Sequence, residues 1–263
     1  MTPRARCQGR LFIRYTLEFW SMADLSGEWL RNAGRRGVPR PVVAEIARRH
    51  GITAESFRVL DGMEKVEDPD GKSFFLLPPG IPGGRARRAA LLTYVLNAAT
   101  DYGAAGDAGD FPPTPYSADE VARIAERQHA NAWTYARDVG FVHRNGGRLV
   151  ATPNGILMGV GGNRIQRQFS RRGGTTWGDI FMLNLGGVAD PAGELRRIVR
   201  SGRAWHVDLD RLLHHEERHS RQWAAKGYAG MLRDYAWELV RELVFGKTNR
   251  LEEDAGLSDG GYR

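Results

Sequence analysis

In the stretch HHEERHSRQW, residues 214–223, His215 and His219 stand on either side of Glu216 in the order H-E-x-x-H. Residues four apart lie one turn above each other on an α-helix, so the two imidazoles can reach one ion. Zn²⁺ accepts histidine nitrogens at about 2.0–2.1 Å. Glu216 lies about 100° further round the helix, where it can take a proton from a water that the ion acidifies. The motif therefore predicts metal-assisted hydrolysis.

A charged helix in solvent is the alternative interpretation of the same residues. Glu217, Arg218 and Arg221 would then only exchange ion pairs. The apolar residues around the histidines favour a half-buried helix instead; they are Leu209, Leu212, Leu213 and Trp223. We expect this helix to begin at Asp208, a good N-cap residue, and to end near Gly227.

A catalytic zinc site needs a third protein ligand and keeps one position open. The chain has a single cysteine, Cys7, so histidine and carboxylate must supply the ligands. The metzincin pattern is excluded because Gln222 and Ala225 stand where it requires glycine and histidine. The remaining usual option is a glutamate from a later helix. Residues 227–246 show an amphipathic helical pattern, and residues 249–256 read NRLEEDAG.

The order H-E-x-x-H-x-x-Q-W, a hydrophobic helix and then N-x-x-E-x-x-A resembles the gluzincin branch of the zincin metallopeptidases. The second motif consists here of Asn249, Glu252 and Ala255. The chain is more closely similar to small bacterial proteins with this core, over residues 145–263. The resemblance implies a zinc-dependent metallopeptidase with Zn²⁺ as cofactor and a peptide or protein as substrate.

For the site itself, the resemblance implies His215, His219 and Glu252 as zinc ligands and Glu216 as general base. Other glutamates stay open as the third ligand, namely Glu238, Glu242 and Glu253. A degenerate zincin that serves as an interaction domain is an alternative to the enzyme, since it could keep the same residues.

Groups that orient the ligands form a second layer of the predicted site. Many gluzincins carry an aspartate four residues after the ligand glutamate, where this chain has Gly256. A carboxylate that orients a ligand histidine must then come from elsewhere, such as Asp234, or be missing. Gln222 lies on nearly the same side of the helix as His219 and is a candidate for this role. An oxyanion donor could come from His206, Tyr228, Tyr235 or Tyr262.

The resemblance implies an α+β fold. A small sheet would place its edge strand, within residues 175–183, beside the metal helix, where the strand can pair with an extended peptide. Residues 103–116 are rich in Gly, Ala, Asp and Pro without a period, which indicates a linker. We therefore expect a mainly helical N-terminal region, residues 1–112. Residues 113–263 would form a zincin-like metal-binding domain with the sheet, the H-E-x-x-H helix and a C-terminal helix.

Local patterns place the other elements. Ser117 and Glu120 form a capping box at the start of a helix. From residue 139 the pattern changes to strands, with tight turns at Asn145-Gly146 and Asn154-Gly155. The remaining predictions are a helical hairpin over 39–60, a strand over 73–77, a helix over 85–99, a strand over 174–183 and a helix over 192–200.

The composition is that of a globular protein, with 41% hydrophobic and 10% aromatic residues. A net charge of +7 and a pI of about 9.8 would suit a polyanion, and the hairpin over 39–60 resembles a helix-turn-helix. Four of the 38 basic residues are lysines, and an arginine excess of this kind often reflects a GC-rich genome. We therefore do not expect nucleic-acid binding. A basic nucleic-acid-binding module with a structural metal is kept as an alternative.

No apolar run approaches the roughly 18 residues that span a bilayer, so the sequence predicts no membrane span. Residues 11–20 follow several arginines and superficially resemble a signal peptide. Arg14 and Glu18 interrupt their apolar part, and no suitable cleavage site follows. We expect a location in the cytoplasm, or export without a standard signal peptide. No oligomeric state follows from the sequence.

Overall fold

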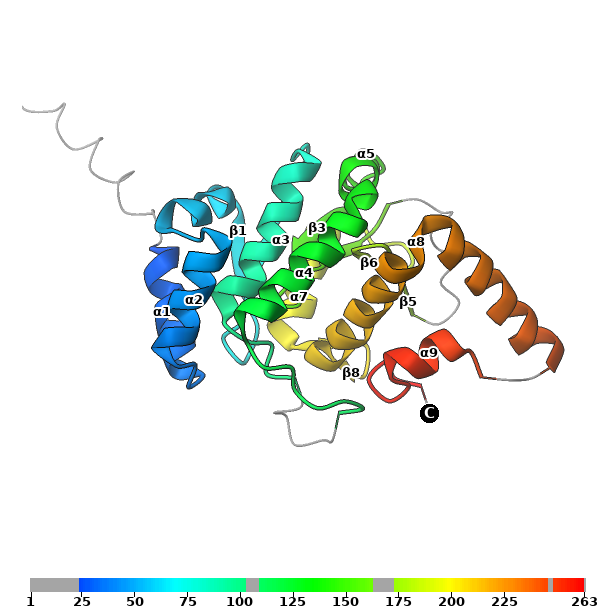
Figure 1. Ribbon diagram of the computed structural model, residues 1–263. Coiled ribbons are helices and arrows are strands. Elements are labelled where there is room, and N and C mark those ends of the chain that lie inside the picture. The colour runs from blue at the N-terminus through cyan, green and yellow to red at the C-terminus, as the bar shows by residue number, and fades with distance from the viewer. Residues whose placement is uncertain (1–23, 103–108, 163–172, 246–247, 263) are drawn as a thin grey trace, which may run out of the picture.

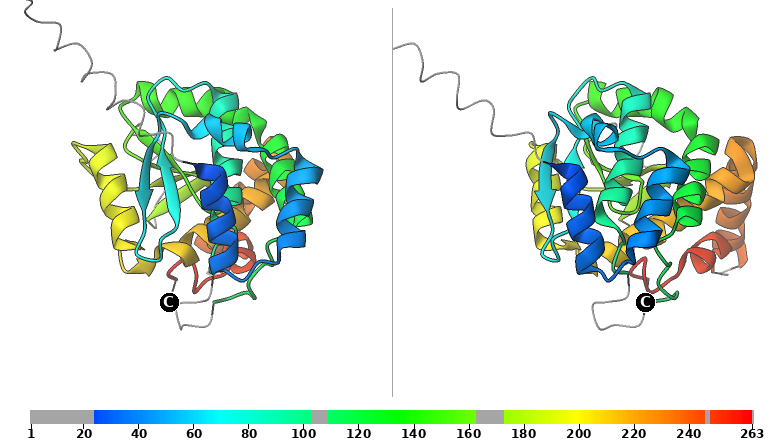
Figure 2. Two further views of the ribbon diagram at one scale, coloured as in Figure 1. Left: turned by 90° about the vertical axis from the view of Figure 1, so that its left-hand side faces the viewer. Right: turned by 60° about the vertical axis from the view of Figure 1, so that its left-hand side comes forward.

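The computed structural model describes residues 24–102, 109–162, 173–245 and 248–262. Within them a six-stranded mixed sheet has helices on both faces (Figures 1 and 2). The expected α+β class is therefore confirmed. The strands of this sheet are β1 (Glu64–Glu67), β2 (Ser73–Leu76), β3 (Arg148–Ala151), β4 (Leu157–Val160), β5 (Gly174–Trp177) and β6 (Ile180–Leu183). A second sheet of two short strands contains β7 (Arg203–Ala204) and β8 (Val207–Asp208).

The helices cover two large hydrophobic cores, one on each face of the sheet, and a third, smaller cluster contains Trp223, Met231 and Leu251. The helices are α1 (Leu25–Arg35), α2 (Arg40–His50), η1 (Ala54–Leu60), α3 (Gly83–Asn97), α4 (Ala118–Ala130), η2 (Thr134–Asp138), α5 (Val139–Arg144), α7 (Pro191–Ser201), α8 (Leu209–Phe245) and α9 (Arg250–Ala255). Successive side chains of a strand point to opposite faces of a sheet. Phe75 and Leu149 accordingly join the core formed with α1 to α5. Phe74 and Val150 join the core formed with α7 and the start of α8.

The sheet runs in the order β1-β2-β3-β4-β6-β5, so β5 forms one of its edges. Neighbouring strands are antiparallel except for β4 and β6, which are parallel. The prediction of one strand over residues 174–183 is wrong, because a tight turn divides this segment into β5 and β6. Gly178 takes φ +60° in the turn, a left-handed conformation that favours glycine. A Cβ there would also lie 2.2 Å from the Thr134 side chain.

One sheet contains strands from both sides of residue 112, because β2 pairs with β3. The predicted linker lies partly outside the described residues, at 103–108. In its described part, the Tyr116 hydroxyl donates a 3.0 Å hydrogen bond to the backbone oxygen of Val95 in α3. The boundary at residue 112 therefore does not separate two sheets. The division of the chain into two domains stays a prediction.

Two local expectations need correction. Residues 139–144 form α5 rather than a strand, and the first strand after them begins only at Arg148. The second arm of the hairpin over 39–60 is η1, a 3₁₀ helix of seven residues. Other local predictions are confirmed: β2 within 73–77, α3 near 85–99, α7 over 192–200, and the Ser117 hydroxyl, which accepts a hydrogen bond from the Glu120 N–H at 3.1 Å.

The motif helix begins and ends where the sequence predicts. The Asp208 carboxylate accepts hydrogen bonds from the N–H groups of Asp210 and Arg211, at 3.0 and 3.2 Å, and so caps α8. Gly227 interrupts α8 with a non-helical φ of +68° and ψ of 171°. The first half of α8 therefore carries the histidines. The second half leads away from the body of the molecule before the chain returns to α9 (Figure 1).

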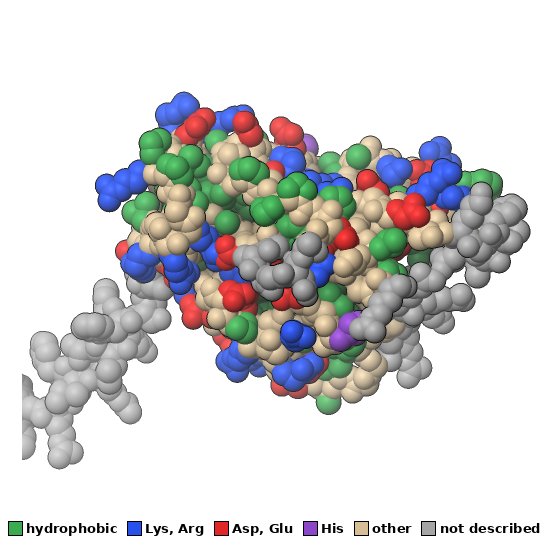
Figure 3. All heavy atoms as spheres, turned by 90° about the horizontal axis from the view of Figure 1, so that it is seen from below, with side chains coloured by type: hydrophobic (Ala, Val, Ile, Leu, Met, Phe, Trp, Pro, Cys, Tyr) green, Lys and Arg blue, Asp and Glu red, His purple; other side chains and the backbone are tan. Residues whose placement is uncertain are grey.

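The surface mixes several kinds of side chain. Apolar side chains of the second half of α8 remain exposed, among them Trp237 at 57% and Val240 at 43%. On the face that Figure 3 shows, basic and acidic side chains are interspersed rather than collected in one basic patch. None of the helices in the described ranges is long and apolar enough to cross a membrane.

Candidate metal centre

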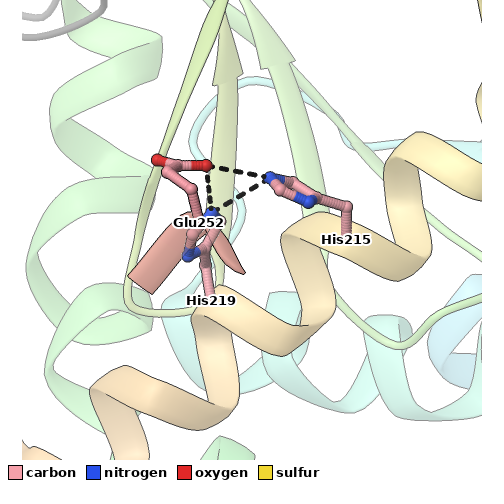
Figure 4. A group of neighbouring side chains, drawn as sticks. All are labelled: His215, His219 and Glu252. Carbon is pink, nitrogen blue, oxygen red and sulfur yellow. Dashed lines mark hydrogen bonds and ion pairs between the residues drawn. The ribbon is translucent and has the colours of Figure 1, made fainter. Parts of the chain in front are cut away.

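His215, His219 and Glu252 come together from two helices, α8 and α9 (Figure 4). The Nε2 atoms of the two histidines lie 3.1 Å apart. Glu252 Oε2 lies 3.4 Å from Nε2 of His215 and 3.3 Å from Nε2 of His219. Among the described residues, this is the one group of His, Cys, Asp and Glu side chains whose ligand atoms converge closely enough to hold a metal ion.

The spacing of these three atoms fits a tetrahedral zinc ion. Ligands at about 2.0–2.1 Å from such an ion lie roughly 3.3 Å from one another. The side chains are also shielded from solvent, at 2% exposure for His215, 11% for His219 and 18% for Glu252. Three ligands leave one tetrahedral position open, as in catalytic rather than structural zinc sites.

Hydrogen bonds fix which nitrogen of each imidazole faces the centre. His215 Nδ1 lies 2.8 Å from the backbone oxygen of Gly256, which can only accept a hydrogen bond. His219 Nδ1 lies 2.9 Å from Gln222 Oε1. In the neutral imidazoles the protons therefore sit on Nδ1, and both Nε2 lone pairs point at Glu252 Oε2. No hydrogen-bond partner among the described residues meets that buried oxygen. A cation at the centre would satisfy all three atoms.

The surroundings favour positive charge at this point. Burial alone would lower the pKa of His219, but Glu252, Glu216 and Gln222 raise the pKa to about 9. Burial would raise the pKa of Glu252, but the two imidazoles hold its pKa well below the usual value. The negative potential that favours a proton on His219 would also favour a bound metal cation.

The groups that orient the histidines differ from the aspartate of many gluzincins. At that sequence position, the backbone oxygen of Gly256 accepts the hydrogen bond from His215. Gln222 contacts His219, as the sequence suggests, and its amide donates to Asp254 Oδ2 at 2.8 Å. Asp234 instead pairs with Lys226 at 2.8 Å. The sequence does not reveal the role of Gly256, because any residue type carries a backbone oxygen. It does not reveal Asp254 either, because Asp254 contacts Gln222 rather than a histidine.

We expect Gln222→Leu to weaken zinc binding by about 10–100-fold, because the Nδ1 of His219 loses the partner that fixes its tautomer. The measurement is a competition titration with a chromogenic zinc chelator. Glu253→Gln is the matched control, since Glu253 is exposed on α9. Equal zinc affinity of Gln222→Leu and wild type would show that the amide does not orient His219.

Glu216 lies beside the ligands but is not one of them. It is 6% exposed, and its Oε2 accepts a 2.5 Å hydrogen bond from the Thr176 hydroxyl of β5. Burial raises the pKa of Glu216 above its ordinary value, against the lowering effect of His215 and His219. A carboxyl group with a raised pKa is suited to accept and release a proton near neutral pH.

The next residue, Glu217, argues against a merely charged helix in solvent. It is 3% exposed and forms ion pairs with Arg127, with Arg123 at 3.0 Å and with Arg221 at 2.6 Å. Burial would raise the pKa of Glu217, but these arginines lower it to about 2. Glu217 therefore attaches the motif helix to α4.

The candidate oxyanion donors lie in different places. The Tyr262 ring centroid is 6.0 Å from that of His215. His206 Nε2 lies 3.7 Å from the position of a Cβ built on Gly261, and so close to the same tail. Tyr228 packs edge-on against Trp133, with ring centroids 5.0 Å apart. Tyr235, which is 36% exposed, lies on the second half of α8. A contact with a ligand ring is therefore observed for Tyr262, while His206 lies beside the neighbouring Gly261.

The segment after α9 packs against the first half of α8, which carries the histidines. A Cβ on Gly260 would lie 2.6 Å from Cε1 of His215, so glycine allows this close approach. Asp259 is fully buried and accepts hydrogen bonds from the Tyr102 hydroxyl and from Arg211. The Tyr102 ring in turn stacks on His214, with centroids 3.7 Å apart. These contacts hold the segment in place beside His215.

The alternative third ligands do not join the centre where the structure describes them. Glu238 pairs with Arg241 and accepts a 3.0 Å hydrogen bond from the Arg250 N–H. Glu253 is exposed. The side chain of Glu242 lies outside the described residues.

No protein-family model, curated protein or solved structure matches the chain. The functional assignment therefore depends on the geometry of the site.

Proposed function

We propose that this protein is a zinc-dependent, gluzincin-like metallopeptidase. The convergence of buried His215, His219 and Glu252 within 3.1–3.4 Å of one another is the observation that carries the proposal. The carboxylate of Glu216, adjacent in the chain to His215, adds the base that hydrolysis needs.

The residues divide the chemistry between them. When bound, a zinc ion would supply a Lewis acid that makes a water more acidic and polarises the substrate carbonyl. His215, His219 and Glu252 would hold the ion, with Gly256 and Gln222 fixing the two imidazoles. Glu216 would accept the proton of the attacking water. Tyr262 and His206 are the proposed donors to the oxyanion.

The proposed substrate is an extended peptide. Strand β5 forms an edge of the sheet and contacts the metal helix through Thr176. A peptide could pair with the outward-facing backbone groups of β5 other than the Thr176 oxygen, which already accepts a hydrogen bond from Trp223. Its carbonyl group would then face the metal centre.

Metal analysis combined with a peptidase assay tests the proposal. Purified protein in zinc-replete buffer is expected to contain one zinc per chain by mass spectrometry and to cleave peptides from a fluorogenic library. Removal of zinc with 1,10-phenanthroline should abolish cleavage, and added zinc should restore it. His219→Ala should lose both zinc and activity.

His129→Ala is the matched control because His129 is exposed on α4, and it should behave as wild type. Absence of stoichiometric zinc would contradict the metal site. Stoichiometric zinc without cleavage of any peptide would contradict the enzyme and favour a zincin-like interaction domain.

A further inference from the structure

Two hydrogen bonds tie the edge strand β5 to the metal helix at one residue, Thr176. Its hydroxyl donates to Glu216 Oε2 at 2.5 Å. Its backbone oxygen accepts a 3.0 Å hydrogen bond from Nε1 of Trp223. All three residues are buried, at 8% exposure for Thr176, 6% for Glu216 and 5% for Trp223. Glu216 and Trp223 lie two turns apart on one face of α8, so the two hydrogen bonds fix β5 relative to that face.

The hydroxyl distinguishes the two oxygens of the Glu216 carboxylate. A free glutamate side chain samples several rotamers, and fixing it in one of them costs conformational entropy. A hydrogen bond to a carboxylate is short and strong because the acceptor is charged. The hydrogen bond from Thr176 occupies one lone pair of Oε2 and stabilises its negative charge, so Oε1 is the oxygen more readily protonated.

We propose that Thr176 is a positioning residue that orients Glu216 for proton transfer, an inference that rests on the proposed peptidase function. The attacking water gives its proton to Glu216 Oε1 while its oxygen bonds to the peptide carbonyl carbon. The carbon–nitrogen bond then breaks, and the amine leaves with the proton that Glu216 returns. Thr176 keeps Oε1 in line for both transfers without contacting the substrate carbonyl itself.

Two substitutions at one position separate this role from simple packing. Thr176→Val keeps the shape of the side chain and removes the hydroxyl, whereas Thr176→Ser keeps the hydroxyl and removes a methyl group. Thr114→Val is the matched control, because it makes the same change at an exposed loop position outside β5 and α8. Steady-state kinetics with a fluorogenic peptide give kcat and KM, and mass spectrometry gives the zinc content.

Thr176→Val is expected to lower kcat by about 10–100-fold, in the range seen for residues that orient a reacting group. KM and zinc content should stay within about twofold of wild type, since neither substrate binding nor the ligands change. Thr176→Ser should keep most of kcat, and Thr114→Val should resemble wild type.

Several outcomes would overturn the inference while leaving the peptidase intact. They are an unchanged kcat in Thr176→Val, an equal loss in Thr176→Ser, or a change confined to KM or zinc content. If wild type cleaves no peptide at full zinc content, the proposed function itself fails. Crystal structures of wild type and Thr176→Val then still decide whether Thr176 orients Glu216. One Glu216 conformer in wild type and several in the valine variant would support that role, and the same single conformer in both would refute it.

Discussion

Glu216→Gln is expected to lower kcat by about 10²–10⁴-fold, the usual contribution of a general base, while the protein keeps one zinc per chain. Glutamine has the same shape but cannot accept the proton of the attacking water. Its amide oxygen can still accept the hydrogen bond from Thr176, so the surrounding structure should persist. Peptide hydrolysis and zinc content are measured on the same sample.

The matched control for this variant is Glu253→Gln, which makes the same change from carboxylate to amide at an exposed position on α9. It should retain wild-type activity and zinc. Hydrolysis by Glu216→Gln at close to the wild-type rate would show that another group accepts the proton.

Arg127→Met is expected to lower the free energy of unfolding by about 3–5 kcal/mol, because it breaks a buried ion-pair network. Arg127 is 4% exposed and pairs with Glu217 and, at 3.2 Å, with Asp179. Asp179 is fully buried, and among the described residues it would keep the neutral donors Tyr135 and Asn131. Urea denaturation followed by circular dichroism gives the change.

Arg196→Met provides the comparison, because Arg196 also pairs with a carboxylate, Glu64 at 2.8 Å, but at the surface. A surface ion pair is worth about 0–1 kcal/mol. Similar midpoints for the two variants would show that the Arg127 network contributes little to stability.

The metal helix could be predicted because its signals are local. The spacing of His215 and His219 needs only a regular helix, and the cap at Asp208 and the break at Gly227 lie within a few residues of its ends. Glu252 was predicted from the N-x-x-E-x-x-A motif, which follows the second half of α8 in the chain. The structure brings it within 3.4 Å of both histidines.

The parts that could not be predicted depend on contacts between distant segments. The residues around Phe75 do not indicate that β2 pairs with β3, because pairing between strands far apart in the chain is decided by tertiary packing. The turn at Gly178 was missed because Trp177-Gly178-Asp179 interrupts a run with strong strand propensity. The contact from His215 to the backbone oxygen of Gly256 has no signature in residue type.

The pairing of β2 with β3 has a practical consequence for anyone who shortens the chain. A fragment that starts at residue 113 would lack β1 and β2 and would leave the backbone groups of β3 free along one side. Open strands of this kind recruit strands from other chains, so such a fragment is at risk of aggregation in expression trials. Substitutions within the intact chain are therefore the better way to ask what the first hundred residues contribute.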